Sequence, residues 1–218
     1  MKKLICITLT AILVLGITVA AFAGPTVSSA MYGDDKAAST SLTTTEVEQK
    51  LIEAGVRDVQ STSWAAGPIA ILVGQGLMAP STDGYFKPAE KVSAVAGVAV
   101  FAKVLGIAAK GDTVEAAFNK AKESGLTEGT SKGDMTRMEV ARMLVKALNV
   151  TPKPIDDAGF SQMVTDAGGL SESDKSILAA LYELGIFRGY PDKTFGPQNV
   201  LTNAEIAALV DRLIGTKQ

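Results

Sequence analysis

The sequence predicts an all-α protein assembled from repeated helix-loop-helix units. Residues 64–106 align without a gap with residues 173–215, 109 positions later. In both copies the apolar residues recur at the three- and four-residue spacing of an amphipathic helix. The identical pairs are Ala70/Ala179, Leu72/Leu181, Gly76/Gly185, Asp83/Asp192, Phe86/Phe195, Pro88/Pro197, Ala99/Ala208 and Gly106/Gly215. A unit of this size cannot bury its apolar face alone, so we expect the copies to stack against one another.

Each long copy has three parts. A short helix ends at Gly76 or Gly185, and glycine supplies the left-handed residue that closes a last helical turn. A turn-rich loop follows, in which Phe86 and Phe195 are expected to be apolar plugs. The longer second helices are expected over residues 93–105 and 202–214.

The middle copy, over residues 112–148, is shortened. From Gly125 to the expected helix start at Thr136 there are 11 positions, against 17 in the outer copies. The Phe/Pro loop is therefore missing from this copy. Its second helix keeps a stripe expected to be buried, made of Met138, Ala141, Leu144 and Leu148.

The second helices begin at recognisable capping residues. Thr136 with Glu139, and Thr202 with Glu205, have the spacing of a capping box. Ser93 keeps the N-cap of the first copy without the glutamate. The residue that follows each N-cap is expected to point outward.

The N-terminus has the layout of a secretory signal peptide. Lys2 and Lys3 precede the apolar run 4–20, and Ala21-Phe22-Ala23 forms a small-x-small cleavage site. An uncleaved membrane anchor is the alternative, because the run is almost long enough to span a bilayer. Cys6 lies inside this segment and so is no lipoprotein acceptor. No membrane span is expected after cleavage.

A linker and a leading helix come before the first copy. Residues 24–44 are small and polar, which is typical of a flexible linker. Thr45 and Glu48 then have capping-box spacing, and Val47 and Leu51 begin one apolar stripe.

Composition excludes several function classes. The chain has 21 Lys+Arg, 23 Asp+Glu, no His and one Cys, with a net charge of −2. Such a chain has no basic stripe for nucleic acid, and once Cys6 is removed with the leader it has no thiol nucleophile, disulfide or ordinary zinc site. The adjacent acids Asp156 and Asp157 suggest a hydrolase only weakly, because such pairs in loops are usually solvated. No enzyme activity and no cofactor are expected.

The third copy is similar to a repeat of the S-layer homology (SLH) family. The family's pattern is a glycine and an aliphatic residue, then Gly-Tyr-Pro-Asp-Gly-x-Phe-x-Pro, then Thr-Arg-Ala-Glu. This chain has Gly185-Ile186, then Gly189-Tyr190-Pro191-Asp192-Lys193-Thr194-Phe195-Gly196-Pro197, then Thr202-Asn203-Ala204-Glu205. Asp58 and Trp64-Ala65 resemble the family's Asp…Trp-Ala opening. Residues 56–215 therefore resemble three SLH repeats, with the middle one shortened.

The resemblance implies a pseudo-three-fold helical bundle of three SLH-like helix-loop-helix repeats. It also implies non-covalent binding to a cell-wall polysaccharide, usually a pyruvylated one, held in grooves between repeats. The ketal of such a polymer offers a carboxylate, and arginine presents a planar fork of donors to it. The candidate ligand-binding residues are Arg137, Trp64, Gly189, Tyr190, Asp192 and Lys193.

The chain departs from the family pattern at the motif arginine. This residue is Ala94 in the first copy, Arg137 in the second and Asn203 in the third, so one intact groove at most is expected. The charge of Arg137 opposes the dipole of the helix that it begins, which favours another use for it. It is either a carboxylate clamp or a solvated surface charge. Trp64 is either a sugar platform or a packing residue.

Two functions remain open. The chain is a secreted protein of the cell wall or cell surface (S-layer) that binds wall polysaccharide, or a drifted SLH scaffold for self-association or contact with envelope proteins. The expected divisions are the signal peptide 1–23, the linker 24–44, the leading helix and first repeat 45–106, the degenerate second repeat 107–150 and the third repeat 151–218.

Overall fold

The computed structural model describes residues 42–128 and 132–216, which fold as helices joined by loops. The elements are α1 (Thr44–Glu53), α2 (Ala66–Gly74), α3 (Ala94–Val104), α4 (Val114–Glu123), α5 (Arg137–Ala147), α6 (Asp157–Met163), the 3-10 turn η1 (Ala167–Gly169), α7 (Glu172–Glu183) and α8 (Asn203–Gly215). These ranges contain isolated β-bridges but no strand, so the all-α prediction is confirmed. The predicted signal peptide and most of the predicted linker lie outside the described residues.

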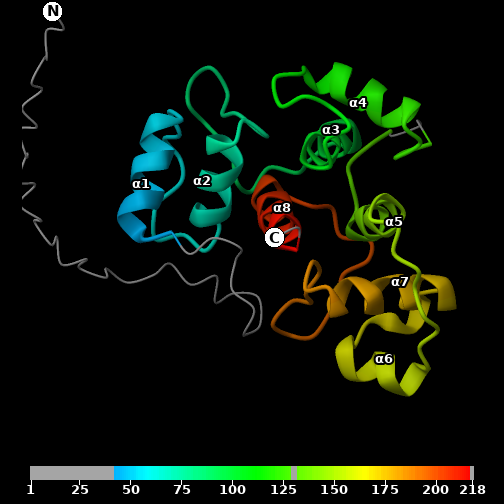
Figure 1. Cartoon of the computed structure of the whole chain (residues 1–218). Coiled ribbons are helices and arrows are strands. Elements are labelled where there is room, and N and C mark those ends of the chain that lie inside the picture. The colour runs from blue at the N-terminus through cyan, green and yellow to red at the C-terminus, as the bar shows by residue number, and fades with distance from the viewer. Residues whose placement is uncertain (1–41, 129–131, 217–218) are drawn as a thin grey trace, which may run out of the picture.

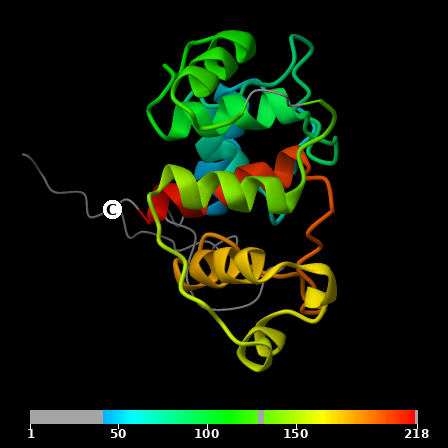
Figure 2. The ribbon, with the colours of Figure 1, turned by 90° about the vertical axis from the view of Figure 1, so that its right-hand side faces the viewer.

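Three inner helices, α3, α5 and α8, surround the centre of the molecule (Figure 1). Each inner helix is the second helix of its repeat and packs on the first helix of the next repeat: α3 on α4, α5 on α7, and α8 on α2. Figure 2 shows α5 and α8 lengthwise, with α3 on one side and α7 on the other. Because α8 returns to α2, the three repeats close into a ring, which confirms the pseudo-three-fold bundle.

The core is built from the apolar stripes of the inner helices. Phe101, Leu144 and Leu209, one from each inner helix, are buried. Phe86 and Phe195 are buried as well, so the prediction that they are plugs under their loops is confirmed. Burying a side chain of this size contributes about 1.5–3 kcal/mol, so these positions supply much of the stability of the ring.

The predicted helix starts are largely correct. Thr136 and Thr202 each form a full capping box with the glutamate three residues on, and Ser93 caps α3 through its hydroxyl alone. The prediction for the leading helix is wrong by two residues. The box of α1 joins Thr43 to Glu46, because Thr43 is the extended residue (ψ 157°) whose N–H and hydroxyl reach the Glu46 carboxylate.

Three backbone hydrogen bonds close a triangle at the point where the three inner helices begin. The Val92 N–H donates to the Leu201 carbonyl, the Leu201 N–H to the Met135 carbonyl, and the Met135 N–H to the Val92 carbonyl, each at 2.9 Å. Each of these residues stands immediately before an N-cap, and all three side chains are buried. The triangle therefore marks the pseudo-three-fold axis and holds one strand-like segment from every repeat beside its two neighbours.

None of the helices in the part of the chain that the structure describes is long and apolar enough to cross a membrane.

Leu201→Ala tests the buried apolar side chains of the residues that form the triangle. Leu201 is 0% exposed, so its truncation leaves a cavity shared by all three repeats. We expect the free energy of unfolding in urea to fall by about 2–5 kcal/mol. Leu184→Ala makes the same change at a residue that is 41% exposed, and we expect it to cost under about 1 kcal/mol. Equal losses in the two variants would contradict a shared core at the axis.

Candidate functional site

The loop of the third repeat is fastened by a carboxylate that the sequence analysis did not single out. Asp166 accepts the N–H of Phe195 on one oxygen and the N–H of Gly196 on the other, both at 2.7 Å. Gly196 has φ 64°, a left-handed conformation that turns two successive N–H groups toward one anion. The carboxylate therefore fixes the Phe195 peptide in place.

The first repeat has the same fastening. Asp58 accepts the N–H groups of Phe86 and Lys87 at 2.8 and 2.7 Å, and Lys87 has φ 57°. Asp58 was recognisable from the family opening. Asp166 was not recognised from the sequence, because the 109-residue offset between the copies pairs Asp58 with Ala167, one position after Asp166. An alignment that allowed a single-residue shift before α7 could have found it.

Arg137 holds the opposite side of the Phe195 peptide. Its side chain is only 2% exposed. Nε donates to the Phe195 carbonyl at 2.7 Å and Nη2 donates to the Arg188 carbonyl at 2.9 Å. Of the two alternatives for Arg137, the solvated surface charge is therefore wrong. The guanidinium enters the loop because the bridge between Thr136 and Val200 lays the start of α5 along that loop.

Three aromatic rings surround the Arg137 guanidinium. Its central carbon lies 4.6 Å from the ring centre of Tyr190, 4.8 Å from that of Phe195 and 5.5 Å from that of Phe187. Ring faces attract cations, and more strongly where water is excluded. Among the described residues no carboxylate is within ion-pairing distance of Arg137. The site is therefore a buried cation neutralised by carbonyl dipoles and rings alone.

The residue after an N-cap does not point outward, contrary to the sequence prediction. Asn203 in α8 repeats the arrangement of Arg137, and its Nδ2 donates to the carbonyls of Phe86 and Lys87 at 3.1 and 3.0 Å. Ala94 in α3 has no side-chain donor, and its backbone N–H donates to the Gly133 carbonyl. This position faces the loop of a neighbouring repeat, and where it holds Arg137 or Asn203 the side chain links the two repeats.

Two further candidate residues lie beside Arg137. The Tyr190 hydroxyl donates to Glu205 at 3.0 Å, and burial raises the pKa of this phenol. A Cβ at Gly189 would lie 3.0 Å from both the Thr194 carbonyl oxygen and the Tyr182 hydroxyl, so a larger residue would require these neighbours to shift. That Tyr182 hydroxyl is buried without a hydrogen-bond partner among the described residues, and burial raises its pKa to about 12.

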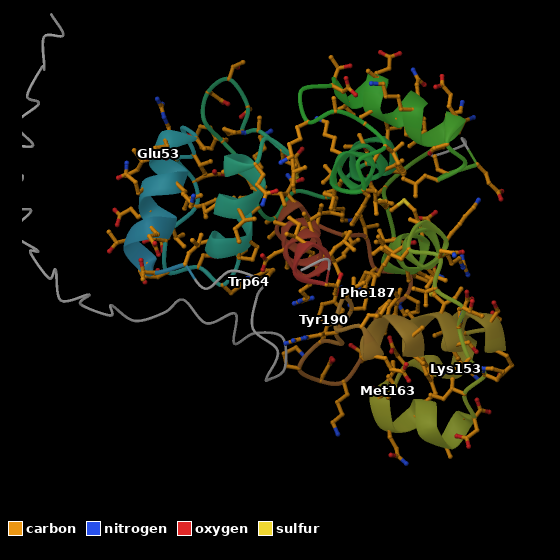
Figure 3. All side chains as sticks on the ribbon, viewed as in Figure 1. Glu53, Trp64, Lys153, Met163, Phe187 and Tyr190 are labelled. Carbon is orange, nitrogen blue, oxygen red and sulfur yellow. The ribbon has the colours of Figure 1, made fainter. Side chains whose placement is uncertain are left out.

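The other candidates lie farther from the guanidinium. Asp192 and Lys193 are exposed at the loop tip, where Asp192 accepts the N–H and hydroxyl of Thr194 at 2.9 and 2.7 Å. These bonds lower the pKa of Asp192 and show that its carboxylate forms the turn at the loop tip. Trp64 is half-buried against the core just before α2 (Figure 3). Arg137, Gly189 and Tyr190 lie in one site, and none of the described contacts of Arg137 is with Trp64.

Within residues 42–128 and 132–216 no group of His, Cys, Asp and Glu could hold a metal ion. What the ring offers instead is a series of contacts between the start of one inner helix and the loop of a neighbouring repeat. Such an arrangement is that of a repeat-built module in which each repeat contacts its neighbours.

Comparison with known proteins identifies the repeats. The family model for the S-layer homology domain matches residues 57–93 and 165–207, which belong to the first and third repeats. These two regions of the chain are therefore S-layer homology repeats, as their loop and helix-start motifs predicted. Domains of this family are non-catalytic anchoring modules.

The curated relatives are larger proteins. The chain is 24% identical to exoglucanase XynX of Acetivibrio thermocellus over 168 residues, which are 70% of this chain and 16% of the relative. It is 28% identical to a cellulosome-anchoring protein of the same organism over 164 residues, 64% of this chain and 36% of the relative. It is 26% identical to the S-layer protein EA1 of Bacillus anthracis over 181 residues, 73% and 20% of the two chains. The similarity thus covers most of this chain and a minor part of each relative.

Asp166→Asn tests the fastening of the third loop. The amide keeps one acceptor and presents its NH₂ to a backbone N–H, which leaves a half-buried donor unpaired. We expect the free energy of unfolding to fall by about 1–3 kcal/mol, measured by urea denaturation. Asp192→Asn is the control, because an exposed asparagine forms the same turn, and its effect should stay within about 0.5 kcal/mol. An Asp166→Asn protein as stable as the parent would show that the carboxylate is dispensable.

Proposed function

We propose that this protein binds a cell-wall polysaccharide non-covalently and so holds itself to the bacterial cell surface. The observation that carries the proposal is Arg137, a buried cation without an anionic partner among the described residues. Burying an uncompensated charge is costly, so a site that keeps one is built to meet an anion. A guanidinium has five N–H donors. In Arg137, Nε and Nη2 each donate one hydrogen bond to a backbone carbonyl, which leaves the other donors for a ligand.

The chemistry of the groove fits a sugar that carries a carboxylate. A pyruvyl ketal presents such a group, and the guanidinium of Arg137 would donate to it in a charge-assisted pair. The Tyr190 ring and the bare backbone at Gly189 give the sugar a flat, close surface beside that pair. In this proposal Asp192 and Lys193 contact outer hydroxyls from the loop tip, and Trp64 serves a separate stretch of polymer or packs without touching it.

The names of the similar proteins also support a location at the cell surface. The similar proteins include a cellulosome-anchoring protein and an S-layer protein, so one name speaks of anchoring and the other of a surface layer. We therefore propose secretion through the N-terminal leader and residence in the cell wall or S-layer. We propose no catalytic role, because the recognisable repeats account for nearly all of residues 56–215.

A drifted scaffold is the second candidate, favoured by the uncharged residues Ala94 and Asn203 at the positions equivalent to Arg137. Such a protein would bind itself or another envelope protein through the same ring. The closure of α8 on α2 weighs against it, because a closed ring has no open end for stacking further repeats.

Arg137→Asn separates charge from architecture. Asparagine is the residue that links two repeats at position 203, so this variant keeps a neutral link and loses the cation. We expect binding to purified cell-wall sacculi, measured by cosedimentation, to weaken by about 10–100-fold, the worth of one charge-assisted pair. Parent binding should fall equally when the pyruvyl ketal is removed chemically from the sacculi.

The matched control is Arg57→Asn, the same substitution at an exposed arginine of the first repeat. Its binding should equal that of the parent. If the parent protein binds sacculi neither with nor without the ketal, the anchoring proposal is refuted and the scaffold is favoured. Equal weakening by both substitutions would show a general effect of charge rather than a site at Arg137.

A further inference from the structure

A hollow lies between α3 and α5, at the junction where the sequence has lost both partners of the other junctions. Elsewhere Arg137 and Asn203 each reach into a full-length loop of a neighbouring repeat. Here the residue at that position is Ala94, and the facing loop belongs to the middle repeat, which lacks the Phe/Pro segment. The space between the two helices, here termed the α3–α5 hollow, has a volume of about 370 Å³.

The floor of the α3–α5 hollow is apolar and suits an aromatic ring. It is formed by Ala94, Val98, Leu126, Met135 and Met143, all of them buried. Methionine side chains adapt to the shape of a partner, and their sulfur contacts aromatic rings favourably. The volume is within the range of sites that hold a small ligand, so one ring fits.

The rim of the hollow carries two ammonium groups that are not engaged elsewhere. Lys132 and Lys146 are exposed and have neither a hydrogen bond nor an ion pair with any described residue. Arg142 also lines the hollow, but Asp174 holds it through two bonds of 2.9 and 2.8 Å. An occupant with an aromatic ring beside a carboxylate would therefore match both the floor and the rim.

The loop of the first repeat presents such a ring at its tip. Tyr85 is 48% exposed, and its hydroxyl makes no hydrogen bond with a described residue. The counterpart 109 positions later is Thr194, whose hydroxyl donates to Asp192 at 2.7 Å. The third repeat thus forms the equivalent loop without an aromatic residue at this position, so the loop geometry does not account for the tyrosine.

A carboxylate stands beside this ring. Asp83 is exposed two positions before Tyr85 and accepts the Ser81 hydroxyl at 2.5 Å. That bond lowers the pKa of Asp83, so the group is ionised at neutral pH. The tip of the loop is therefore complementary in charge to the lysines at the rim.

The loop is also held rigidly in its own ring. Asp58 accepts the N–H groups of Phe86 and Lys87, and Asn203 donates to the carbonyls of the same two residues. Tyr85, the preceding residue, does not line the α3–α5 hollow of its own molecule, and the fastened loop cannot swing there. A preorganised ring costs little entropy to dock, so the matching partner is a second copy of this chain.

We propose that the Tyr85 loop of one copy, residues 81–87, inserts into the α3–α5 hollow of another copy. The ring of Tyr85 lies on Met135 and Met143, and the Asp83 carboxylate meets the Lys146 ammonium. This self-association goes beyond the proposed function and does not depend on wall binding. It also needs no open end of the ring, because the loop and the hollow both lie on the closed structure.

The contact joins two different surfaces of the same molecule. Each copy in a pair keeps one unused loop and one unused hollow, so further copies add head to tail into a row. A contact made by one loop is small, so we expect a dissociation constant on the order of 0.1–1 mM in solution. Copies held together on a wall associate more completely, because their effective concentration is higher.

The test uses methionine methyl groups as reporters. The protein is labelled with ¹³C at these methyls, and its spectrum is recorded over a concentration range that brackets the expected dissociation constant. An aromatic ring stacked on a methyl group lowers its chemical shift. We expect the Met135 and Met143 signals to move in this direction as the concentration rises, while Met138, in the core, and Met163, on α6, stay in place.

Single substitutions assign the two halves of the contact. Tyr85→Ser should weaken the self-association by about tenfold or more, whereas Leu184→Ser, at another exposed apolar residue, should leave it unchanged. Lys146→Glu places a carboxylate opposite Asp83 and should weaken the association to a similar degree. Lys122→Glu, at an exposed lysine in the last turn of α4, is its matched control and should have no effect.

Mixing the two defective variants tests the head-to-tail geometry. Labelled Tyr85→Ser keeps an intact hollow, and unlabelled Lys146→Glu keeps an intact loop. Neither should associate alone, but the mixture should restore the shifts of Met135 and Met143 at the parent affinity. With the labels exchanged, no shift should appear, because the labelled hollow is then the defective one.

Several results would overturn the proposal. Parent signals that do not depend on concentration over this range would refute the self-association. Shifts that survive Tyr85→Ser would show that another group enters the hollow, and shifts that survive Lys146→Glu would refute the pairing with Asp83. A mixture that stays silent, with both variants shown to be folded by circular dichroism, would refute the insertion of the loop into the hollow.

Discussion

The structure depends on the triangle of backbone hydrogen bonds among Val92, Met135 and Leu201. These bonds satisfy buried polar groups of three segments at once, and each segment leads directly into the N-cap of an inner helix. The start of every inner helix is thereby set beside the loop of a neighbouring repeat. The ring closure, the position of the residue after each N-cap and the junctions between repeats all follow from that constraint.

In the proposed function, Arg137 lets one junction serve both architecture and recognition. The Phe195 peptide is held on its N–H side by Asp166 and on its carbonyl side by Arg137, so loop geometry and cation position are one arrangement. A guanidinium placed in this way is preorganised, and a ligand need not spend binding energy to order it. Asn203 keeps the architectural half of this role without the charge.

The repeats differ in two linked features: the length of the loop and the residue of the neighbouring inner helix that faces it. Where the loop is full length, the facing residue is Arg137 or Asn203, and each hydrogen-bonds to that loop. Where the loop is short, the facing residue is Ala94 and a hollow remains. A long polar side chain at position 94 would have lost its carbonyl partners with the loop, which accounts for an alanine there.

The sequence by itself determined the helical repeats, the capping boxes at Thr136 and Thr202, the buried Phe plugs and the S-layer homology motifs of the outer repeats, because these depend on residues close together in the chain. It could not decide the surroundings of Arg137. A residue just inside a helix start is solvated in an isolated helix, and only the ring, through the neighbouring loop, buries it among carbonyls and three aromatic rings. Asp166 and the α3–α5 hollow likewise come from contacts between segments distant in sequence, which spacing alone does not report.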